Sequence, residues 1–197
     1  DLLIKPTWEE VPEEDRDKLV IEIDPGTAFG TGMHETTQLC IRQLQKYMQA
    51  GDEIADIGTG SGILGITALK LGAGHVYGTD LDEEAVPAVH DNLQANGLPE
   101  SCFDMVVGNV IGDDAIKSRM GLGKYDIVVA NILAPVIVLL TAEVGPLLKK
   151  DGLFITSGIL DQREAEVLEA FRQHEDIWEV LEVNHQGEWV NVTARRK

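Results

Sequence analysis

The sequence contains only two cysteines, Cys40 and Cys102, and neither belongs to a Cys-x-x-Cys pair. A structural zinc site and a redox-active cysteine pair are therefore not predicted, and reduced thiols in a cytoplasmic protein are the default expectation. The sequence also lacks an apolar run of about 20 residues, the length that spans a bilayer. Its most apolar stretch, residues 127–142, is interrupted by Asn131 and Pro135. We predict a strand followed by a buried helix there, and no membrane contact.

Positive charge is scarce, with 16 Lys and Arg against 34 Asp and Glu and a formal net charge of −18. Nucleic-acid backbones are bound by clustered Lys and Arg. The only basic cluster, residues 195–197, is explained by a solvated terminus. We therefore expect no direct contact with nucleic acid. An acidic surface favours cationic partners such as basic proteins or amines, although solubility alone is the simpler explanation.

The length and composition suit one sizeable domain, since 44% of the 197 residues are apolar and no internal repeat is present. Residues 9–17 are charged and contain a proline, which predicts a solvated connector. Before it, residues 2–8 are predicted to be an extended segment that packs Trp8. We expect the compact domain to begin near residue 18. Because the chain starts at Asp1 without a methionine, we also expect a fragment or a processed form.

Strand-like apolar runs alternate with helical patterns along most of the chain. Strands are predicted at 18–23, 53–57, 75–80, 104–108, 125–130 and 152–157, and helices at 37–49, 62–71, 83–96, 112–119, 135–148 and 161–173. Because parallel neighbours need a crossover connection, this alternation predicts a parallel sheet with helices on both faces.

The C-terminal part breaks this alternation. Residues 177–183 and 188–194 are two strand-like runs, and the short link at 184–187 demands an antiparallel hairpin. A parallel sheet that ends in such a hairpin is more typical of Rossmann-like methyltransferases than of dehydrogenases, which is an analogy at the level of fold.

A glycine-rich turn follows the second predicted strand. The strand gives way to Gly58, Gly60 and Gly62, after which helical spacing resumes. Glycines let the backbone approach a ligand where any Cβ would collide, so we predict that this turn binds a nucleotide. The identity of the nucleotide stays open. Residues 60–65 also satisfy the dinucleotide pattern Gly-x-Gly-x-x-Gly, and Asp80 follows at about the distance of a ribose-binding acid.

Two other strand ends are expected at the same edge of the sheet, where open α/β folds bind their ligands. One ends at Asp80, which we assign to the ribose hydroxyls, and we assign Asp82 to capping the next helix. The other ends at Asn131, which would stand at the floor of the cleft. Capping of the helix that Pro135 helps to start is an equally good explanation for Asn131.

A long glycine-rich loop, residues 24–37, leads into the first predicted helix. Thr36 or Thr37 is a natural N-cap, but capping explains only part of the loop. A loop that closes over a ligand explains the rest, with Phe29 as its apolar cover. His34 is a candidate catalytic base, although a lone histidine beside a helix start is more often a local hydrogen-bond partner.

Three motifs occur in order along the chain. They are Asp24-Pro25-Gly26-x-Ala28-Phe29-Gly30-Thr31-Gly32-x-His34-x-Thr36-Thr37, Asp56-Ile57-Gly58-x-Gly60-Ser61-Gly62-Ile63-Leu64, and Ala130-Asn131-Ile132-Leu133. Together they resemble the ordered signatures of the ribosomal protein L11 methyltransferase family. The similarity extends from about Ile4 to the C-terminal hairpin, including Glu188-Trp189, and so covers essentially the whole chain. The glycine turn alone would be a weak match, whereas three motifs in the right order are a specific one.

The resemblance implies an α/β fold of the Rossmann-like class I methyltransferase type: a mostly parallel seven-stranded sheet, helices on both faces and a C-terminal antiparallel hairpin. It implies S-adenosylmethionine as cofactor, and the lysine side chains and N-terminal amine of ribosomal protein L11 as methyl acceptors. The cofactor contacts of the family correspond to Thr37, Gly58, Asp80 and Asn131. The resemblance also implies that residues 1–17 are the remnant of a linker from an N-terminal recognition domain, and that residues 18–197 are the methyltransferase domain. We expect a monomer.

Three positions depart from the family pattern. Met33 stands where threonine is usual, and Thr59 where cysteine is common. Pro87 falls inside the helix predicted at 83–96, where it removes a backbone donor and would shift or kink the helix.

Methyl transfer to an amine depends on how the methyl donor and the amine are positioned, and on a free lone pair on the amine nitrogen. A lysine amine must first lose a proton, and the Asn131 oxygen can accept an amine hydrogen, whereas a carboxylate there would stabilise the ammonium. Two other functions stay open. An NAD-dependent oxidoreductase would use the glycine turn and Asp80 but leave residues 24–37 and Asn131 without a role. A non-catalytic module that binds S-adenosylmethionine is the second.

Overall fold

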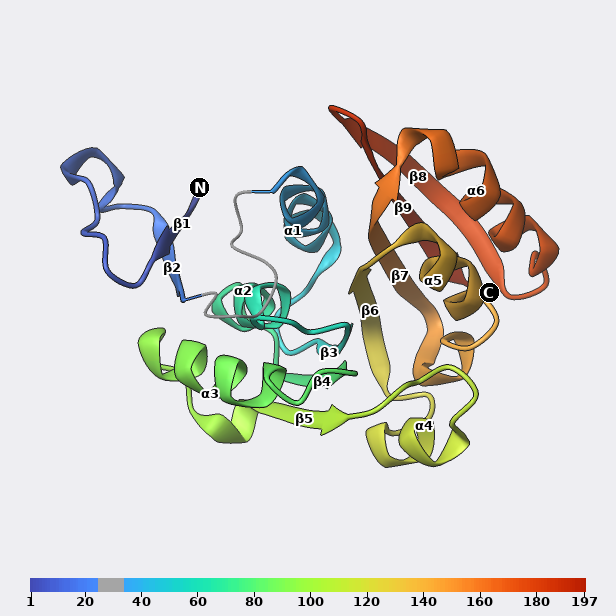
Figure 1. Cartoon of the computed structure of the whole chain (residues 1–197), viewed down its shortest axis with the longest axis horizontal. Coiled ribbons are helices and arrows are strands. Elements are labelled where there is room, and N and C mark those ends of the chain that lie inside the picture. The colour runs from blue at the N-terminus through green and yellow to red at the C-terminus, as the bar shows by residue number, and fades with distance from the viewer. Residues whose placement is uncertain (25–33) are drawn as a thin grey trace.

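A seven-stranded sheet forms the centre of the computed structural model, which describes residues 1–24 and 34–197. The strand order is β5-β4-β3-β6-β7-β9-β8 (Figure 1). The strands are β3 (Glu53–Ile57), β4 (His75–Asp80), β5 (Phe103–Val107), β6 (Tyr125–Asn131), β7 (Leu148–Leu160), β8 (Trp178–Gln186) and β9 (Trp189–Arg196). The strands from β5 to β7 are parallel, and β9 is antiparallel to both β7 and β8. The predicted sheet and its terminal hairpin are confirmed.

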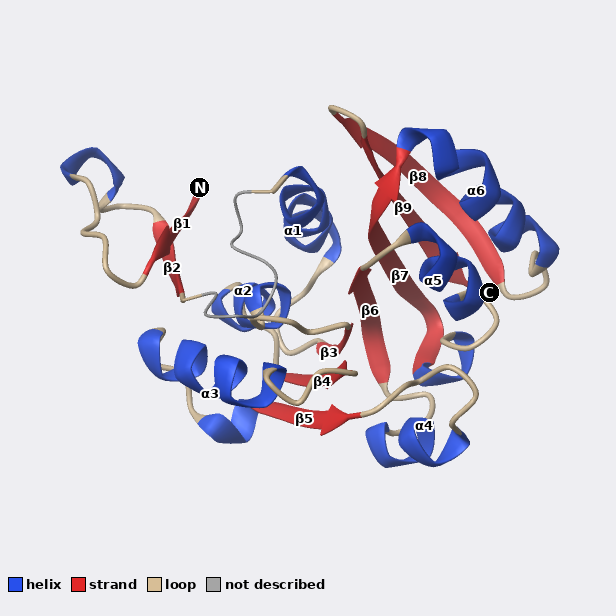
Figure 2. Cartoon of the chain, in the orientation of Figure 1, coloured by secondary structure: helices blue, strands red, loops and turns tan. Residues whose placement is uncertain are grey.

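Helices cover both faces of this sheet (Figure 2). One face packs against α1 (Glu35–Tyr47), α2 (Ile63–Lys70) and α3 (Ala85–Ala95), and the other against α4 (Asp114–Met120), α5 (Ala134–Leu140) and α6 (Glu164–Gln173). Side chains along each strand alternate between the two cores. In β6, Ile127 and Val129 belong to the first core, and Val128 and Ala130 to the second. Because both faces of this central strand are buried, residues 127–130 are continuously apolar.

A small two-stranded parallel sheet lies at the N-terminus, beside the central sheet (Figure 1). It consists of β1 (Leu2–Pro6) and β2 (Leu19–Ile23), with a 3-10 turn at Glu13–Asp15 between them. Lys5 is only 6% exposed and donates to the Glu22 carboxylate at 2.5 Å and to the Glu9 carbonyl at 2.7 Å. Trp8 is 67% exposed, so the prediction that this segment packs its indole was wrong. Residue 18, where we expected the compact domain to begin, immediately precedes β2.

Several element boundaries differ from the sequence prediction. The strand predicted at 152–157 extends over Leu148–Leu160, and most helices begin or end about two residues from their predicted bounds. The helix predicted at 135–148 ends at Leu140 and continues as turns into a 3-10 segment at Gly145–Leu147. The glycine and proline of that segment prevent the helix from continuing. The hairpin link predicted at 184–187 is also shorter, because β8 continues to Gln186 before the chain turns.

Pro87 does not break α3, which is continuous over Ala85–Ala95 and starts two residues later than predicted. The helix begins at Ala85, so Pro87 lies in the first turn, where the missing N–H has no helical partner to lose. Over residues 1–24 and 34–197, no helix is both long enough and apolar enough to cross a membrane.

Candidate active site

A cavity of about 750 Å³ opens at the carboxyl ends of β3, β4 and β6. The chain first extends the sheet from β3 through β4 to β5 and then places β6 on the other side of β3, so the strand order reverses there. Open α/β sheets bind ligands at this reversal point. The cavity wall is formed by His34, Thr36, Ile57, Gly58, Gly60, Thr79, Asp80, Leu81, Asp82, Ala85, Gly108, Asn109, Val110, Ile111, Asn131, Ile132, Leu133, Val136, Leu140, Gly158 and Trp189.

Two of the three predicted glycines line this cavity. Gly58 has φ +76°, and a Cβ there would lie 2.6 Å from Cγ2 of Ile132, so only glycine fits. Gly60 has φ +56° and also contributes to the wall. Gly62 serves a different purpose. It is the N-cap of α2 and has a left-handed backbone conformation. A Cβ at this position would lie 3.1 Å from Cγ2 of Val89 on α3, so the lack of a side chain allows the two helices to approach each other.

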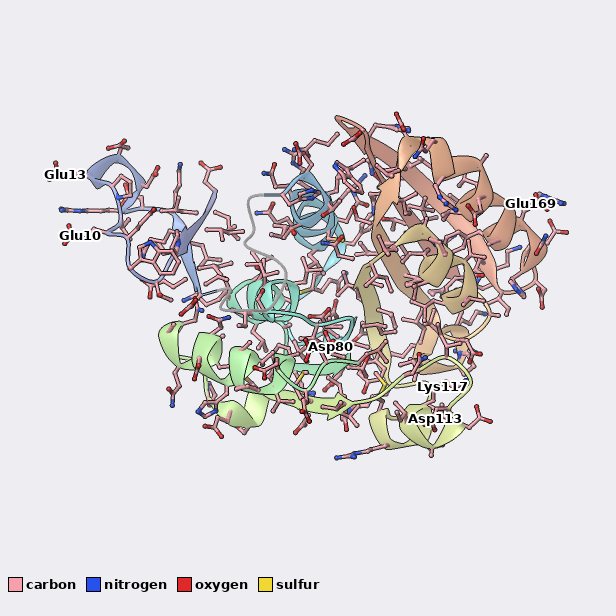
Figure 3. All side chains as sticks on the ribbon, in the orientation of Figure 1. Glu10, Glu13, Asp80, Asp113, Lys117 and Glu169 are labelled. Carbon is pink, nitrogen blue, oxygen red and sulfur yellow. The ribbon has the colours of Figure 1, made fainter. Side chains whose placement is uncertain are left out.

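Asp80 ends β4 and faces the cavity from the middle of the molecule (Figure 3). Its Oδ2 accepts the Gly60 N–H at 2.8 Å, and its Oδ1 accepts the Asp82 N–H at 2.9 Å. These two backbone donors orient the carboxylate, which keeps further lone pairs for a ligand. Asp82 also lines the cavity. Its Oδ1 accepts the Glu84 N–H at 2.9 Å, a capping hydrogen bond in the turn that leads into α3, although the N-cap position of the helix itself is Glu84.

Asn131 ends β6 at the floor of the cavity, as predicted. Its Nδ2 donates to Oγ1 of Thr37 at 3.3 Å. Thr37 is fully buried and lies behind Asn131, outside the cavity wall. The N-cap of α5 is Leu133, so Asn131 does not cap that helix. With its nitrogen donated to Thr37, the amide has its oxygen to offer to a ligand.

His34 is the N-cap of α1, and our prediction of Thr36 or Thr37 in that role was wrong. Its Nδ1 accepts the Thr36 N–H at 3.3 Å and lies 2.8 Å from the Thr36 hydroxyl. The imidazole also packs edge-on against Trp189 across the cavity, with ring centroids 5.0 Å apart. His34 is therefore a helix cap that also contributes to the wall. Phe29, the predicted cover, lies outside the described residues.

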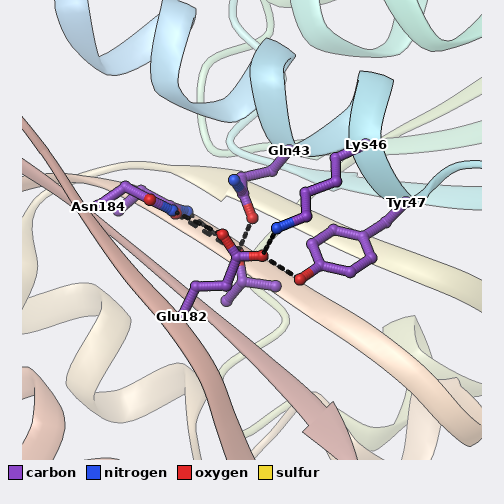
Figure 4. Close-up of polar contacts among 7 residues, drawn as sticks. Gln43, Lys46, Tyr47, Glu182 and Asn184 are labelled. Atoms are coloured by element: carbon purple, nitrogen blue, oxygen red, sulfur yellow. Dashed lines mark hydrogen bonds and ion pairs between the residues drawn. The ribbon is translucent and has the colours of Figure 1, made fainter.

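A polar network fixes the far end of α1 to the C-terminal hairpin (Figure 4). Glu182 on β8 accepts from Lys46 at 2.5 Å and from the Tyr47 hydroxyl. These donors hold the pKa of Glu182 down at about 2. The network continues through Gln43, Asn184, Asn191 and Thr193. It sets the position of the helix whose first turn carries His34 and Thr37.

Sequence reasoning missed three parts of the wall. Residues 108–111 follow β5, and the end of that predicted strand could have indicated them. Gly158 has φ +85°, and a Cβ would lie 2.4 Å from the Ile132 carbonyl oxygen. Trp189 begins β9, which pairs antiparallel with β7, so its start reaches the edge where the parallel strands end. No local pattern in the sequence indicates that placement.

Asp56 lies beneath the glycine turn and is 1% exposed. Burial raises the pKa of its carboxyl to about 8, and the charge of Asp80 adds to the effect. The Gly65 N–H, which Oδ2 of Asp56 accepts at 3.3 Å, only partly offsets it. The carboxyl is therefore predominantly neutral at pH 7 and supports the turn from below without reaching the cavity wall.

Comparisons with known proteins agree with the fold and the position of this cavity. A family model described as ribosomal protein L11 methyltransferase matches residues 1–197. The ribosomal protein L11 methyltransferase of Agathobacter rectalis is 55% identical over 199 residues, and that of Lachnospira eligens is 52% identical over 197. Both alignments cover 100% of this chain but only 61% and 62% of the relatives. The chain therefore spans about three fifths of the length of these relatives.

A solved structure shows the same fold. The crystal structure of a ribosomal protein L11 methylase from Lactobacillus delbrueckii subsp. bulgaricus matches with a TM-score of 0.86 and 34% sequence identity. The match covers 100% of this chain and 95% of that chain.

Proposed function

Because the chain belongs to the ribosomal protein L11 methyltransferase family, we propose that it transfers methyl groups from S-adenosylmethionine to lysine side-chain and N-terminal amines of ribosomal protein L11. The observation that carries this proposal is one cavity at the strand-reversal point. It combines an oriented carboxylate, Asp80, with an oriented amide, Asn131, on either side of a glycine turn.

The residues on the β4 and β5 side of the cavity fit an adenosyl group. Gly58 and Gly60 present bare backbone, and the Asp80 carboxylate is held where it can accept the two hydroxyls of a ribose. Asn109 adds an amide to the same side. When bound there, S-adenosylmethionine supplies a methyl group activated by a sulfonium. We place Gly62 behind this surface as a support, and Thr37 behind Asn131 on the β6 side.

The residues on the β6 side fit an amine acceptor. Asn131 offers an oxygen that accepts a hydrogen of a neutral amine and turns its lone pair toward the cavity, while Thr37 keeps the amide from rotating. An uncharged amide at this point does not stabilise the ammonium form, whose unperturbed pKa is about 10.4. The His34 and Trp189 rings, which pack edge-on against each other, add an aromatic part to the cavity wall. We propose His34, which also lines the cavity, as the base that removes the proton of the amine.

Further parts of the proposal concern the whole protein. We propose that residues 18–197 act as the methyltransferase domain and that residues 1–17 link it to a substrate-recognition domain. Since the proposed substrate is a ribosomal protein, we place the activity in the cytoplasm. A monomer without direct nucleic-acid or membrane contact is the simplest form that agrees with the acidic composition.

Two experiments test the proposal. Thermal unfolding with S-adenosylmethionine or with NAD distinguishes a methyltransferase from an oxidoreductase, because a ligand that binds only the native state raises the melting temperature. We expect a rise with S-adenosylmethionine and none with NAD. Mass spectrometry of L11 after incubation with enzyme and methyl donor, using this chain and a full-length relative, should show added methyl groups. Cofactor binding without methylation by either protein would leave only a non-catalytic module.

A further inference from the structure

Two asparagines, Asn92 on α3 and Asn96 at the C-cap of that helix, act as substitute strand partners for the end of β2 and the residue that follows it. Asn96 accepts the Glu22 N–H at 2.9 Å and donates to the Glu22 carbonyl at 2.7 Å. Asn92 accepts the Asp24 N–H at 2.8 Å and donates to the Asp24 carbonyl at 2.9 Å. Residues four apart on a helix lie on one face, and residues two apart on a strand lie on one side. The two amides therefore match the spacing of a strand edge.

Each asparagine makes one further hydrogen bond. Nδ2 of Asn96 donates to the Asn92 carbonyl of its own helix at 2.7 Å, whereas the further bond of Asn92 reaches another segment. Nδ2 of Asn92 also donates to the Ser61 carbonyl at 2.8 Å, which lies inside the glycine turn. Both Asn92 and Ser61 are 0% exposed. Gly62 makes this approach possible, since a side chain there would press against Val89, one helical turn before Asn92. A single buried amide thus connects the glycine turn to Asp24.

The position of these contacts relates them to the cofactor site. Gly60, next to Ser61, lines the cavity and donates its N–H to Asp80. A turn of left-handed glycines has few conformational restraints of its own. Its backbone must therefore be held by outside contacts, and the hydrogen bond from Asn92 to Ser61 supplies one of them on the side opposite Asp80.

We propose that Asn92 is a positioning residue for cofactor binding: it holds the glycine turn in register with Asp80 and ties it to Asp24. This rests on the proposed function, since the cofactor is S-adenosylmethionine. Asn92 lies outside the cavity wall in the described part of the chain, so its effect reaches the ligand through the turn.

The test compares Asn92→Ala with Asn96→Ala. Asn96→Ala loses a two-way pairing with Glu22 and Asn92→Ala loses one with Asp24, so both should melt at a lower temperature, but only Asn92→Ala removes the hydrogen bond to the Ser61 carbonyl. By calorimetric titration with S-adenosylhomocysteine we expect the Kd to rise about three- to tenfold for Asn92→Ala and less than twofold for Asn96→Ala. In the methylation assay the KM for S-adenosylmethionine should rise in the same ratio while kcat stays within about twofold. Equal Kd values for the two variants would overturn the proposal.

A measurement on the unmodified chain covers the case in which Asn92→Ala does not fold. Hydrogen exchange of the Asp24 and Glu22 amides is followed by NMR with and without saturating S-adenosylhomocysteine. We expect the ligand to slow exchange at Asp24, whose N–H is bonded to Asn92, more than at Glu22, and the same protection at both amides would refute the coupling. Failure of the proposed function is distinguishable, because the unmodified chain would then not bind S-adenosylhomocysteine at all.

Discussion

Replacing Asp56 by Asn should change how the stability of the protein depends on pH. The carboxyl is buried under the glycine turn, and its pKa is raised from 3.8 to about 8. Between these two values the folded chain keeps a proton that the unfolded chain has lost. The folded state binds more protons, so stability falls as pH rises through this range.

The size of this change in stability follows from the pH range over which only the folded chain keeps the Asp56 proton. One bound proton changes the free energy of unfolding by about 1.4 kcal/mol per pH unit. From pH 5 to pH 7, Asp56 alone should therefore lower the stability by about 2.7 kcal/mol. Asparagine is neutral at every pH and can still accept the Gly65 N–H, so Asp56→Asn should lose this slope.

Urea unfolding at pH 5, 6 and 7 measures the effect. The stability difference between Asp56→Asn and the unmodified chain should grow in favour of the variant by about 2.7 kcal/mol over this range. Asp91 is exposed on α3, and Asp91→Asn should run parallel to the unmodified chain at all three pH values. A parallel line for Asp56→Asn as well would show that the folded protein does not hold the proton, and would refute the argument from burial.

Other variants test the site and its support. Asn131→Asp should keep the Kd for S-adenosylhomocysteine within about threefold but lower kcat roughly 100-fold, since a carboxylate retains the amine proton; equal losses in both constants would exclude this role. Gly58→Ala should lower the free energy of unfolding in urea by about 3 kcal/mol or more, because the new methyl group would meet Ile132. The control Gly97→Ala, at φ +64° with open space around it, should lower it by about 1 kcal/mol. Glu182→Gln should lower the stability by roughly 1–2 kcal/mol at pH 7, a figure reduced for solvent screening because Lys46 is 56% exposed. In the unmodified chain the contribution of Glu182 should disappear as pH falls from about 4.5 toward about 2, because the carboxylate becomes protonated. If the stability of Glu182→Gln differs from that of the unmodified chain by the same amount at pH 7 and at pH 2.5, the ion pair is not the cause of the difference.

The strands, the sheet type and the turn could be predicted because local patterns report them. The apolar run at 53–57 followed by spaced glycines has few other structural solutions, and the link after residue 183 is too short for anything but a hairpin. Asp80 and Asn131 were predictable for the same reason. Each is the polar residue that ends a buried strand, and the ends of parallel strands meet at one edge.

The sequence by itself thus determined the architecture, the edge of the sheet that carries the site, and the strand-end residues that face it. Only the tertiary structure decided which groups complete the wall and which residues hold it in place. Trp189 reaches the cavity because an antiparallel strand begins where parallel ones end, and Gly62 is needed because α3 approaches α2 there. His34 takes the cap that a threonine was expected to hold, and Asn92 connects segments 31 and 68 residues away. The His34 cap is a local contact with Thr36. The roles of Trp189, Gly62 and Asn92 depend on contacts between distant segments, which no local periodicity encodes.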